Sequence, residues 1–201
     1  MKYVSIDIET TGLEPGFHQV IEFGAAIEDT ENLIPICKLP TFRALIKHNE
    51  YTISPFCLRL HKDLLDELTG FQKNNPGGWE DYYKEINTYV CMDSALPYLF
   101  TGWLKKNGID PTQKVVVAGK NFNKFDLPHI KPILKSSVKF HRRVMDPTTL
   151  FTLPTDQEPP NLGECARRAG LEFTGNGYHS AVGDAIMVIE LLRAGWNKLE
   201  N

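Results

Sequence analysis

The order of strand-like and helix-like segments restricts the folds that this chain can adopt. Three strand-like runs come first, at residues 2–8, 19–28 and within 34–48, and short turn-prone segments separate them. Short connections are typical of antiparallel neighbours. After them, segments with helical periodicity alternate with short apolar runs. This order indicates an α/β fold with a central mixed sheet of about five strands, the first three antiparallel, flanked by helices.

The rest of the chain is expected to supply the helices and the remaining strands of one domain over residues 1–201, a length that suits a single core. Ser54 and Pro55 suit the cap and first turn of a helix. The expected segments are, in order, a helix over 54–68, a loop over 72–78, a helical region over about 79–106, a buried strand over 114–118, a helix from near 125, a strand over 140–146, a loop over 153–160, a short helix over 161–169 and a last helix over about 180–198.

The charges are unevenly distributed along the chain. Residues 1–100 hold 8 Lys and Arg against 15 Asp and Glu, residues 101–143 hold 10 against 2, and residues 144–201 hold 4 against 8. The net charge of −3 therefore hides one strongly basic segment. Such a segment is a candidate phosphate-facing surface, although the same lysines would also serve to solvate two helices.

The sequence excludes several classes of protein. No stretch approaches the roughly 20 apolar residues of a membrane span, and Asp7 and Glu9 interrupt what would have to be the apolar region of a signal peptide. We therefore expect an intracellular, cytoplasmic protein without a membrane partner. The four cysteines are far apart and form no C-x-x-C pair, which argues against a zinc site and a disulfide framework.

A D-x-E motif, Asp7-Ile8-Glu9, lies in the first strand. Alternate side chains of a strand point to the same face, so the two carboxylates lie close together. That arrangement is costly unless a cation or a proton offsets the repulsion, and hard oxygen ligands suit Mg²⁺ or Mn²⁺. By itself the motif also fits a strand end with two solvated acids.

Two further acidic positions follow later in the chain. Asp126 comes after the apolar strand 114–118, where α/β sheets often place ligands, although an acid there can equally satisfy backbone amides at a helix start. His179 is expected at the entry to the last helix, with Asp184 about one turn inside it. A carboxylate within an apolar helix needs a partner.

These motifs together resemble those of the DEDDh exonucleases, the DnaQ-like members of the RNase H-like superfamily. D-x-E-T-T-G, F-D after a central strand and H-x-A-x-x-D at the last helix occur in the family's order and span residues 7 to 184. The related DEDDy branch has Tyr four positions before the last Asp, where this chain has Ser180. The family's second motif often has Asn four residues before its Asp, whereas this chain has Phe122 there, between Asn121 and Asn123, so neither asparagine is assigned a role.

The resemblance implies a 3′→5′ exonuclease of RNase H-like fold that releases nucleoside 5′-monophosphates from single-stranded DNA or RNA 3′ ends with two Mg²⁺ or Mn²⁺ ions. It implies that Asp7 bridges the two ions, that Glu9 and Asp184 complete the ion on the nucleophile side, and that Asp126 supports the other. His179 would act as the general base, and its ordinary pKa of about 6.5 suits proton transfer near neutral pH.

The resemblance also indicates where the terminal nucleotide binds. The expected substrate contacts from the resemblance are Thr10, Thr11, Gly12 and Leu13 in the loop after the first strand. The charge count adds Lys120 and Lys124 of the basic segment as expected phosphate contacts. His61 could face the site from the 54–68 helix, but a partly exposed helix histidine is the favoured interpretation. Two other classes stay open, a catalytically silent nucleic-acid-binding module and a nucleotide phosphohydrolase. Product release from mononucleotides alone would favour the phosphohydrolase.

Overall fold

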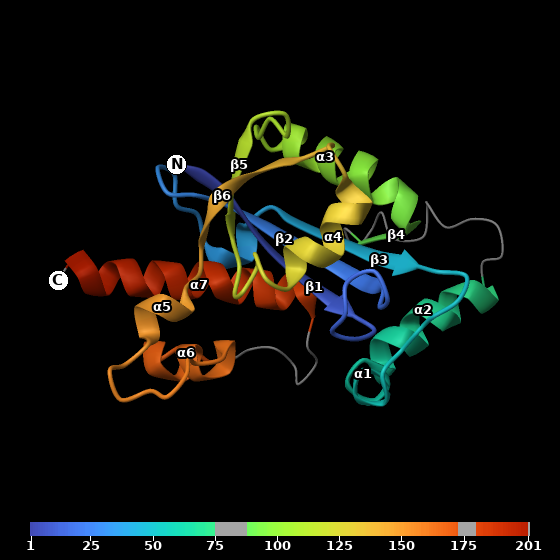
Figure 1. Cartoon of the computed structure of the whole chain (residues 1–201). Helices are drawn as coiled ribbons and strands as arrows, with labels where there is room; N and C mark the ends of the chain where they lie inside the picture. Colours follow the sequence, from blue (N-terminus) through green and yellow to red (C-terminus); the bar gives the residue numbers. More distant parts are fainter. Residues whose placement is uncertain (75–87, 173–179, 201) are drawn as a thin grey trace.

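The sheet contains six strands in the described part of the chain, one more than expected. The structure, a computed structural model, describes residues 1–74, 88–172 and 180–200. The strands lie in the order β4-β3-β2-β1-β5-β6, as Figure 1 shows. Their bounds are β1 Lys2–Thr10, β2 Val20–Asp29, β3 Thr41–Lys47, β4 Thr88–Met92, β5 Lys114–Ala118 and β6 Lys139–Met145.

The pairing confirms the expected mixed sheet. β1, β2 and β3 form an antiparallel meander, and β5 and β6 add to β1 in parallel. The helical region expected over about 79–106 is wrong at Thr88–Met92, which pairs in parallel with β3. Thr88 and Val90 are buried while Tyr89 is exposed, an alternation that suits a strand. The free edge of β3, distant in the sequence, provides the strand with which it pairs. Residues 79–87 lie outside the described residues.

The helices cover both faces of the sheet. They are α1 Pro55–Leu60, α2 Lys62–Asn74, α3 Leu96–Lys106, α4 Asp126–Leu134, α5 Thr148–Phe151, α6 Leu162–Ala169 and α7 Ala181–Glu200, with short 3₁₀ turns at Ile36–Lys38 and Asp93–Ala95. α3 and α4 pack on one face over a core that includes Ile6, Phe42 and Phe100. α7 lies on the opposite face, as Figure 1 shows. It packs there in a cluster that includes Tyr3 and Ala26.

Several helix boundaries agree with their sequence signals. Ser54 caps α1 by accepting the Cys57 N–H at 3.1 Å, and Asn161 caps α6 by accepting the Glu164 N–H at 2.8 Å. The expected helix over 54–68 is split at His61, where α1 ends and α2 begins. α2 continues to Asn74, so the loop expected over 72–78 is wrong at its start, and its remainder falls outside the described residues. No helix among the described residues is long and apolar enough to cross a membrane.

Candidate active site

The D-x-E motif lies at the carboxyl end of β1, on the face of the sheet that α7 covers. Glu9 is buried, and Asp7 is half-buried. Burial, followed by the charges of Glu22, Asp184 and Asp126, raises the pKa of Glu9 to about 8. Burial and the neighbouring acids, Asp126 first, likewise raise the pKa of Asp7 well above its usual range. The two carboxylates therefore repel further negative charge and favour a proton or a cation.

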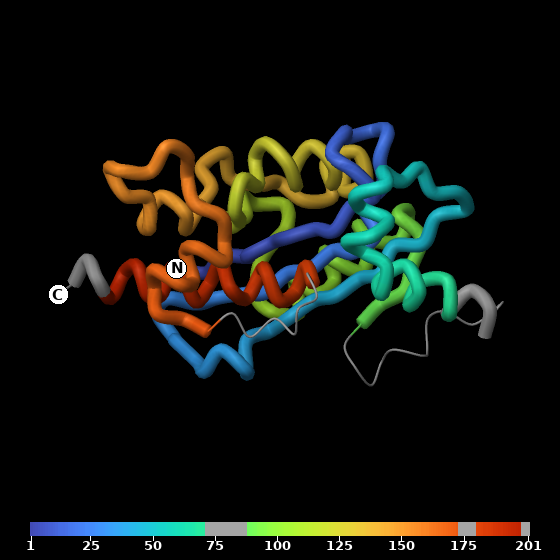
Figure 2. Tube along the Cα trace, turned by 90° about the horizontal axis from the view of Figure 1, so that it is seen from below, coloured from blue at the N-terminus to red at the C-terminus, as the bar shows by residue number. Residues whose placement is uncertain are grey.

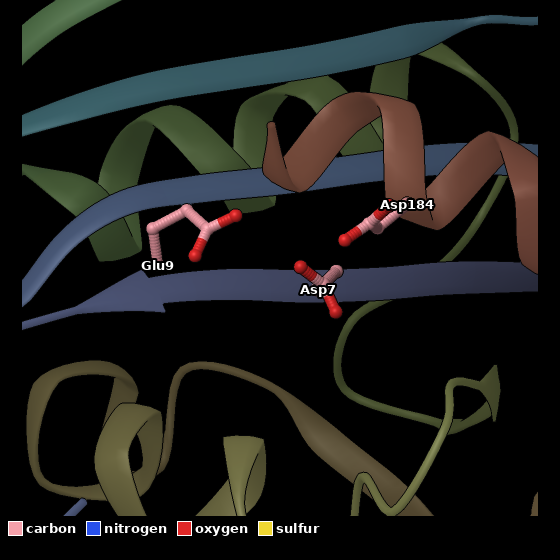
Figure 3. Close-up of side chains that lie close together, drawn as sticks. All are labelled: Asp7, Glu9 and Asp184. Atoms are coloured by element: carbon pink, nitrogen blue, oxygen red, sulfur yellow. The ribbon is translucent and has the colours of Figure 1, made fainter. Parts of the chain in front are cut away.

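Asp184 joins the two β1 acids from the first turns of α7. One carboxylate oxygen each from Asp7, Glu9 and Asp184 lies within 4.8 Å of the others. Figure 3 shows Asp184 pointing from the helix toward β1, where Asp7 and Glu9 lie. Three carboxylates at this separation match the hard oxygen ligands that Mg²⁺ and Mn²⁺ prefer.

Asp126, the fourth expected acid, begins α4 and reaches β1 from the loop after β5. Burial raises the pKa of its carboxyl, and bonds that the carboxylate accepts from its own backbone N–H and the Ile8 N–H partly offset this rise. Asp126 is 2% exposed, and its Oδ1 has no hydrogen-bond partner among the described residues. A buried carboxylate oxygen without a donor is costly, which suits a cation ligand.

The loop before Asp126 explains why Phe122 stands where related proteins often have asparagine. Phe122 is 1% exposed and packs edge-on against Phe140, with ring centroids 5.6 Å apart. It therefore serves the core under β5 and β6. Asn121 and Asn123 are both exposed, and Asn121, at a left-handed φ of 56°, donates its backbone N–H to Asp146 at 2.9 Å.

His179, the expected general base, lies outside the described residues. Ser180, the residue after it, accepts the Gly183 N–H at 3.0 Å and so caps the start of α7. The predicted role of His179 therefore stays a prediction.

His61 is buried and faces the acids, which corrects the favoured interpretation of a partly exposed histidine. It is 5% exposed, and its Nε2 lies 3.5 Å from Oε2 of Glu9. The reason is the helix break at this residue, together with the bond from the Ser54 N–H to the Thr11 carbonyl, which ties the start of α1 to the end of β1. Ser54-Pro55 predicts where the helix begins, but it does not predict that His61 faces the site.

The loop after β1 has a defined internal geometry. The Thr10 hydroxyl donates to the Gly12 carbonyl at 2.7 Å, and the Thr11 hydroxyl donates to the Gln19 side chain at 3.0 Å. A side chain at Gly12 would overlap the His18 ring. Leu13 is 75% exposed, and the loop between β1 and β2 lies beside α1 in Figure 1 and Figure 2. Both threonine hydroxyls are thus engaged within the loop, whose exposed large apolar side chains are those of Leu13 and Phe17.

The two expected phosphate contacts lie on the loop between β5 and α4. Lys120 is half-buried and Lys124 is exposed. The sequence did not single out two further charged residues, Glu22, whose charge acts on Asp7 and Glu9, and its partner Arg43. Glu22 is 1% exposed and pairs with Arg43 at 2.6 Å. A glutamate and an arginine inside two apolar strand runs were the signal that could have identified them.

Comparison with known proteins agrees with this geometry. A family profile described as exonuclease matches residues 4–75, which include Asp7, Glu9, most of β1 and all of β2 and β3. No curated protein sequence matches the chain.

Solved structures share its fold. Cell-death related nuclease 4 matches with a TM-score of 0.67 at 15% identity over 98% of this chain and 64% of its own. The zinc-bound complex of E. coli exonuclease I with single-stranded DNA matches with a TM-score of 0.62 at 14% identity over 100% of this chain and 41% of its own. The same enzyme with a dA16 oligonucleotide matches with a TM-score of 0.58 at 16% identity over 96% and 40%. The chain thus spans about two fifths to two thirds of the length of these structures. The expected RNase H-like fold and the resemblance to DnaQ-like exonucleases are confirmed.

Proposed function

We propose that this chain, which has an RNase H-like fold and resembles the DnaQ-like exonucleases, is a metal-dependent 3′→5′ exonuclease. It would release nucleoside 5′-monophosphates. The observation that carries the proposal is the convergence of Asp7, Glu9 and Asp184 from two elements far apart in the sequence. Asp126 reaches the same strand end through its bond with the Ile8 amide. A binding module would not need this concentration of buried negative charge, which lowers stability unless it serves a cation.

The donor set fits two divalent cations. Four carboxylates supply oxygen ligands only, which favours Mg²⁺ or Mn²⁺ over softer metals. Asp7, whose carboxylate lies close to those of both Glu9 and Asp184, would be shared by the two ions. Glu9 and Asp184 would hold the ion on the nucleophile side, and Asp126 would support the other. When bound, such ions stabilise negative charge on the attacking and leaving oxygens of a phosphodiester.

Proton transfer and substrate binding would be carried out by residues of the chain itself. His179 would accept the proton of the attacking water, since the acids are committed to cations. The loop at Thr10, Thr11 and Gly12 would seat the terminal nucleotide through backbone atoms, and Leu13 would stack on its base. Lys120 and Lys124 would bind phosphates of the same strand. The similar structure of E. coli exonuclease I is a complex with single-stranded DNA, which supports a single-stranded 3′ end as the substrate here.

The test uses 5′-labelled single-stranded DNA, duplex DNA and RNA, each with Mg²⁺ or Mn²⁺. We expect a ladder of labelled products that shorten stepwise from the 3′ end, with slower cleavage of a 3′-phosphorylated strand. Asp184→Asn should lower turnover by roughly 10²-fold or more, because transition-state charge loses its counter-ion. Glu158→Gln, at an exposed position, is the matched control.

Three results would contradict parts of the proposal. Full activity in excess EDTA excludes the metal mechanism. Cleavage of a circular single strand shows an endonuclease. A gel shift without degradation shows a binding module.

A further inference from the structure

The residues beside Asp7 on β2 and β3 form a cradle for the start of α7. Asp7 pairs with Gly24, and Gly24 pairs with Arg43, so the three residues form one row across β1, β2 and β3. Residues directly opposite each other on neighbouring strands point to the same face. Because Gly24 has no side chain, the row has a gap between the carboxylate of Asp7 and the guanidinium of Arg43.

The first turn of α7 fills this gap. A side chain at Gly24 would overlap the backbone of Ala181 and Val182. Glu22, on the same face of β2, accepts the Ala181 N–H at 3.4 Å. Amides of a helix's first turn have no hydrogen-bond partner within the helix, so the Glu22 carboxylate supplies an acceptor for one of these amides of α7. Asp184 lies three residues further along the same helix.

Arg43 compensates the buried charge of Glu22 and links it to α2. Its Nε donates to Glu22 at 2.6 Å, and its two terminal nitrogens donate to the two oxygens of Glu67 at 3.2 and 3.1 Å. Burial raises the pKa of the Glu22 carboxyl, and the charge of Arg43 opposes this rise. Leu64 and Leu68 anchor α2 on the same face against Leu45.

From this geometry we propose that Arg43 is a positioning residue: by holding Glu22 and Glu67 in one fork, it fixes the first turn of α7 against Gly24 and so sets Asp184 at Asp7. The inference deepens the proposed function and rests on the metal site proposed for that function. It assigns Arg43 no contact with substrate. Its effect reaches the acids only through Glu22 and the Ala181 amide.

A matched arginine elsewhere in the fold provides the control. Arg168 of α6 donates from Nε to Glu164 at 2.7 Å and from its two terminal nitrogens to Asp156 at 2.5 and 2.8 Å. Its side chain is 18% exposed against 24% for Arg43. Both arginines thus hold two carboxylates in a fork. Among the described contacts, the fork of Arg43 is joined to the first turn of α7 through Glu22, whereas that of Arg168 lies on Glu164 and Asp156.

The experiment compares the parental protein with Arg43→Met, Arg168→Met and the double variant Glu22→Gln/Arg43→Met. Two quantities are measured: Mn²⁺ affinity by titration, and hydrogen exchange of α7 amides in metal-free protein. Arg43→Met should weaken Mn²⁺ binding by about tenfold, the scale of a lost partner around a metal site. Exchange should quicken at residues 181–184 and stay unchanged in the second half of α7.

The double variant distinguishes positioning from mere stability. The amide introduced by Glu22→Gln can still accept the Ala181 N–H without carrying a charge, so Mn²⁺ affinity should return to within about threefold of parental. Arg168→Met should keep parental Mn²⁺ affinity at a temperature where all variants are folded. The uncompensated Glu22 charge alone would tighten cation binding. Unchanged or tighter Mn²⁺ binding in Arg43→Met, with parental exchange at 181–184, would therefore overturn the proposal.

Two further outcomes are decided in advance. If Arg43→Met does not fold, Arg43→Lys replaces it, because lysine keeps the charge but cannot hold both carboxylates in one fork. Faster exchange at 181–184 in that variant supports the positioning role, and parental exchange overturns it. If the parental protein binds no Mn²⁺, the proposed metal-dependent function fails, while the exchange comparison still tests the positioning role.

Discussion

Gly24 lies directly opposite Asp7 in the β1–β2 pairing, and its missing side chain leaves the space that the backbone of α7 occupies. This relationship joins two distant parts of the chain. The strand that carries the first acid and the helix that carries the last one approach each other closely because the residue between them is a glycine. Asp7, Glu9 and Asp184 thereby come within ligand distance.

Gly24→Ala should therefore damage the site more than its small volume suggests. Overpacking a filled space costs about 1–3 kcal/mol, and here the atoms that must move belong to the α7 backbone. We expect a lower melting temperature and a loss of Mn²⁺ affinity, measured by thermal unfolding and titration. Gly70→Ala is the control, because a Cβ there would meet none of the described residues within 4 Å. If Gly24→Ala matched Gly70→Ala in both measurements, the close approach of α7 would not matter for the site.

The pH dependence of the metal-free protein should reflect the acid cluster. Glu9 has a pKa of about 8 in the folded protein against 4.5 ordinarily, so between these values the folded state retains a proton that the unfolded state releases. Unfolding free energy must then fall as pH rises through this window, by up to about 1.4 kcal/mol per pH unit for each retained proton. Chemical denaturation in EDTA at several pH values across this window measures the slope.

Two comparisons test whether the acid cluster causes this pH dependence of the unfolding free energy. Saturating Mg²⁺ should remove the slope, because the cation replaces the proton, and Asp7→Asn should reduce it and stabilise the metal-free protein. Asp156 and Glu164, whose pKa values are lowered to about 2 mainly by bonds from their arginine partners, lose their contribution only as pH falls toward 2. They do not contribute within the measured window. If the free energy of unfolding in EDTA stayed constant or increased with pH across this window, the acids would not destabilise one another in the folded protein.

His179→Ala should lower turnover by about 10²–10⁴-fold, the usual cost of losing a general base. Mn²⁺ affinity should stay close to parental, because the four carboxylates remain. The acid limb of the rate profile should also change, since that limb would report the imidazole. Parental turnover in the variant would make this histidine a structural residue. Ser180→Ala, which removes only the cap of α7, controls for damage to the helix start.

The sheet and the acids could be predicted to different extents. Local patterns were sufficient where an element has its own period or cap, as in β5 and at Asn161 of α6. β4 was missed because a run of five residues becomes a strand only through its pairing with β3, about forty residues earlier. Alternation along one strand predicts that Asp7 and Glu9 share a face, whereas their expected metal role rests on the resemblance of the three motifs to the DEDDh exonucleases.

Contacts that depend on register could not be predicted. Glu22 and Arg43 appear in the sequence as single charges in two apolar runs. Their pairing depends on which residues of β2 and β3 are opposite each other, and on the length of the arginine side chain. His61 faces Glu9 because the helix breaks at that residue, and helical periodicity across 54–68 continues smoothly through the break. Sequence patterns thus predict the acids that the structure brings together, Asp7, Glu9 and Asp184, but not the neighbouring contacts of Glu22, Arg43 and His61.

The basic segment yields a prediction about substrate binding. Lys120 and Lys124 lie on the loop that leads from β5 to Asp126, within a segment of 10 Lys and Arg against 2 Asp and Glu. An acidic protein needs such a local patch, because its average field repels polyanions. Changing both lysines to Ala should weaken binding of single strands of any sequence. Turnover at saturating substrate should change much less, since neither side chain is proposed to act on the scissile bond.

Salt dependence distinguishes phosphate contact from general charge. Each phosphate neutralised on a single strand contributes about −0.7 to the slope of log affinity against log salt, so the double variant should flatten that slope by roughly 1.4. The measurement uses single-stranded DNA with Ca²⁺ in place of Mg²⁺ to block cleavage. The control pair is Lys105 and Lys106, which are exposed at the end of α3. The chain continues from there to the start of β5, whereas Lys120 and Lys124 follow its end. Changing them to Ala alters the net charge equally, so equal slopes for the two double variants would mean that Lys120 and Lys124 act only through the overall field.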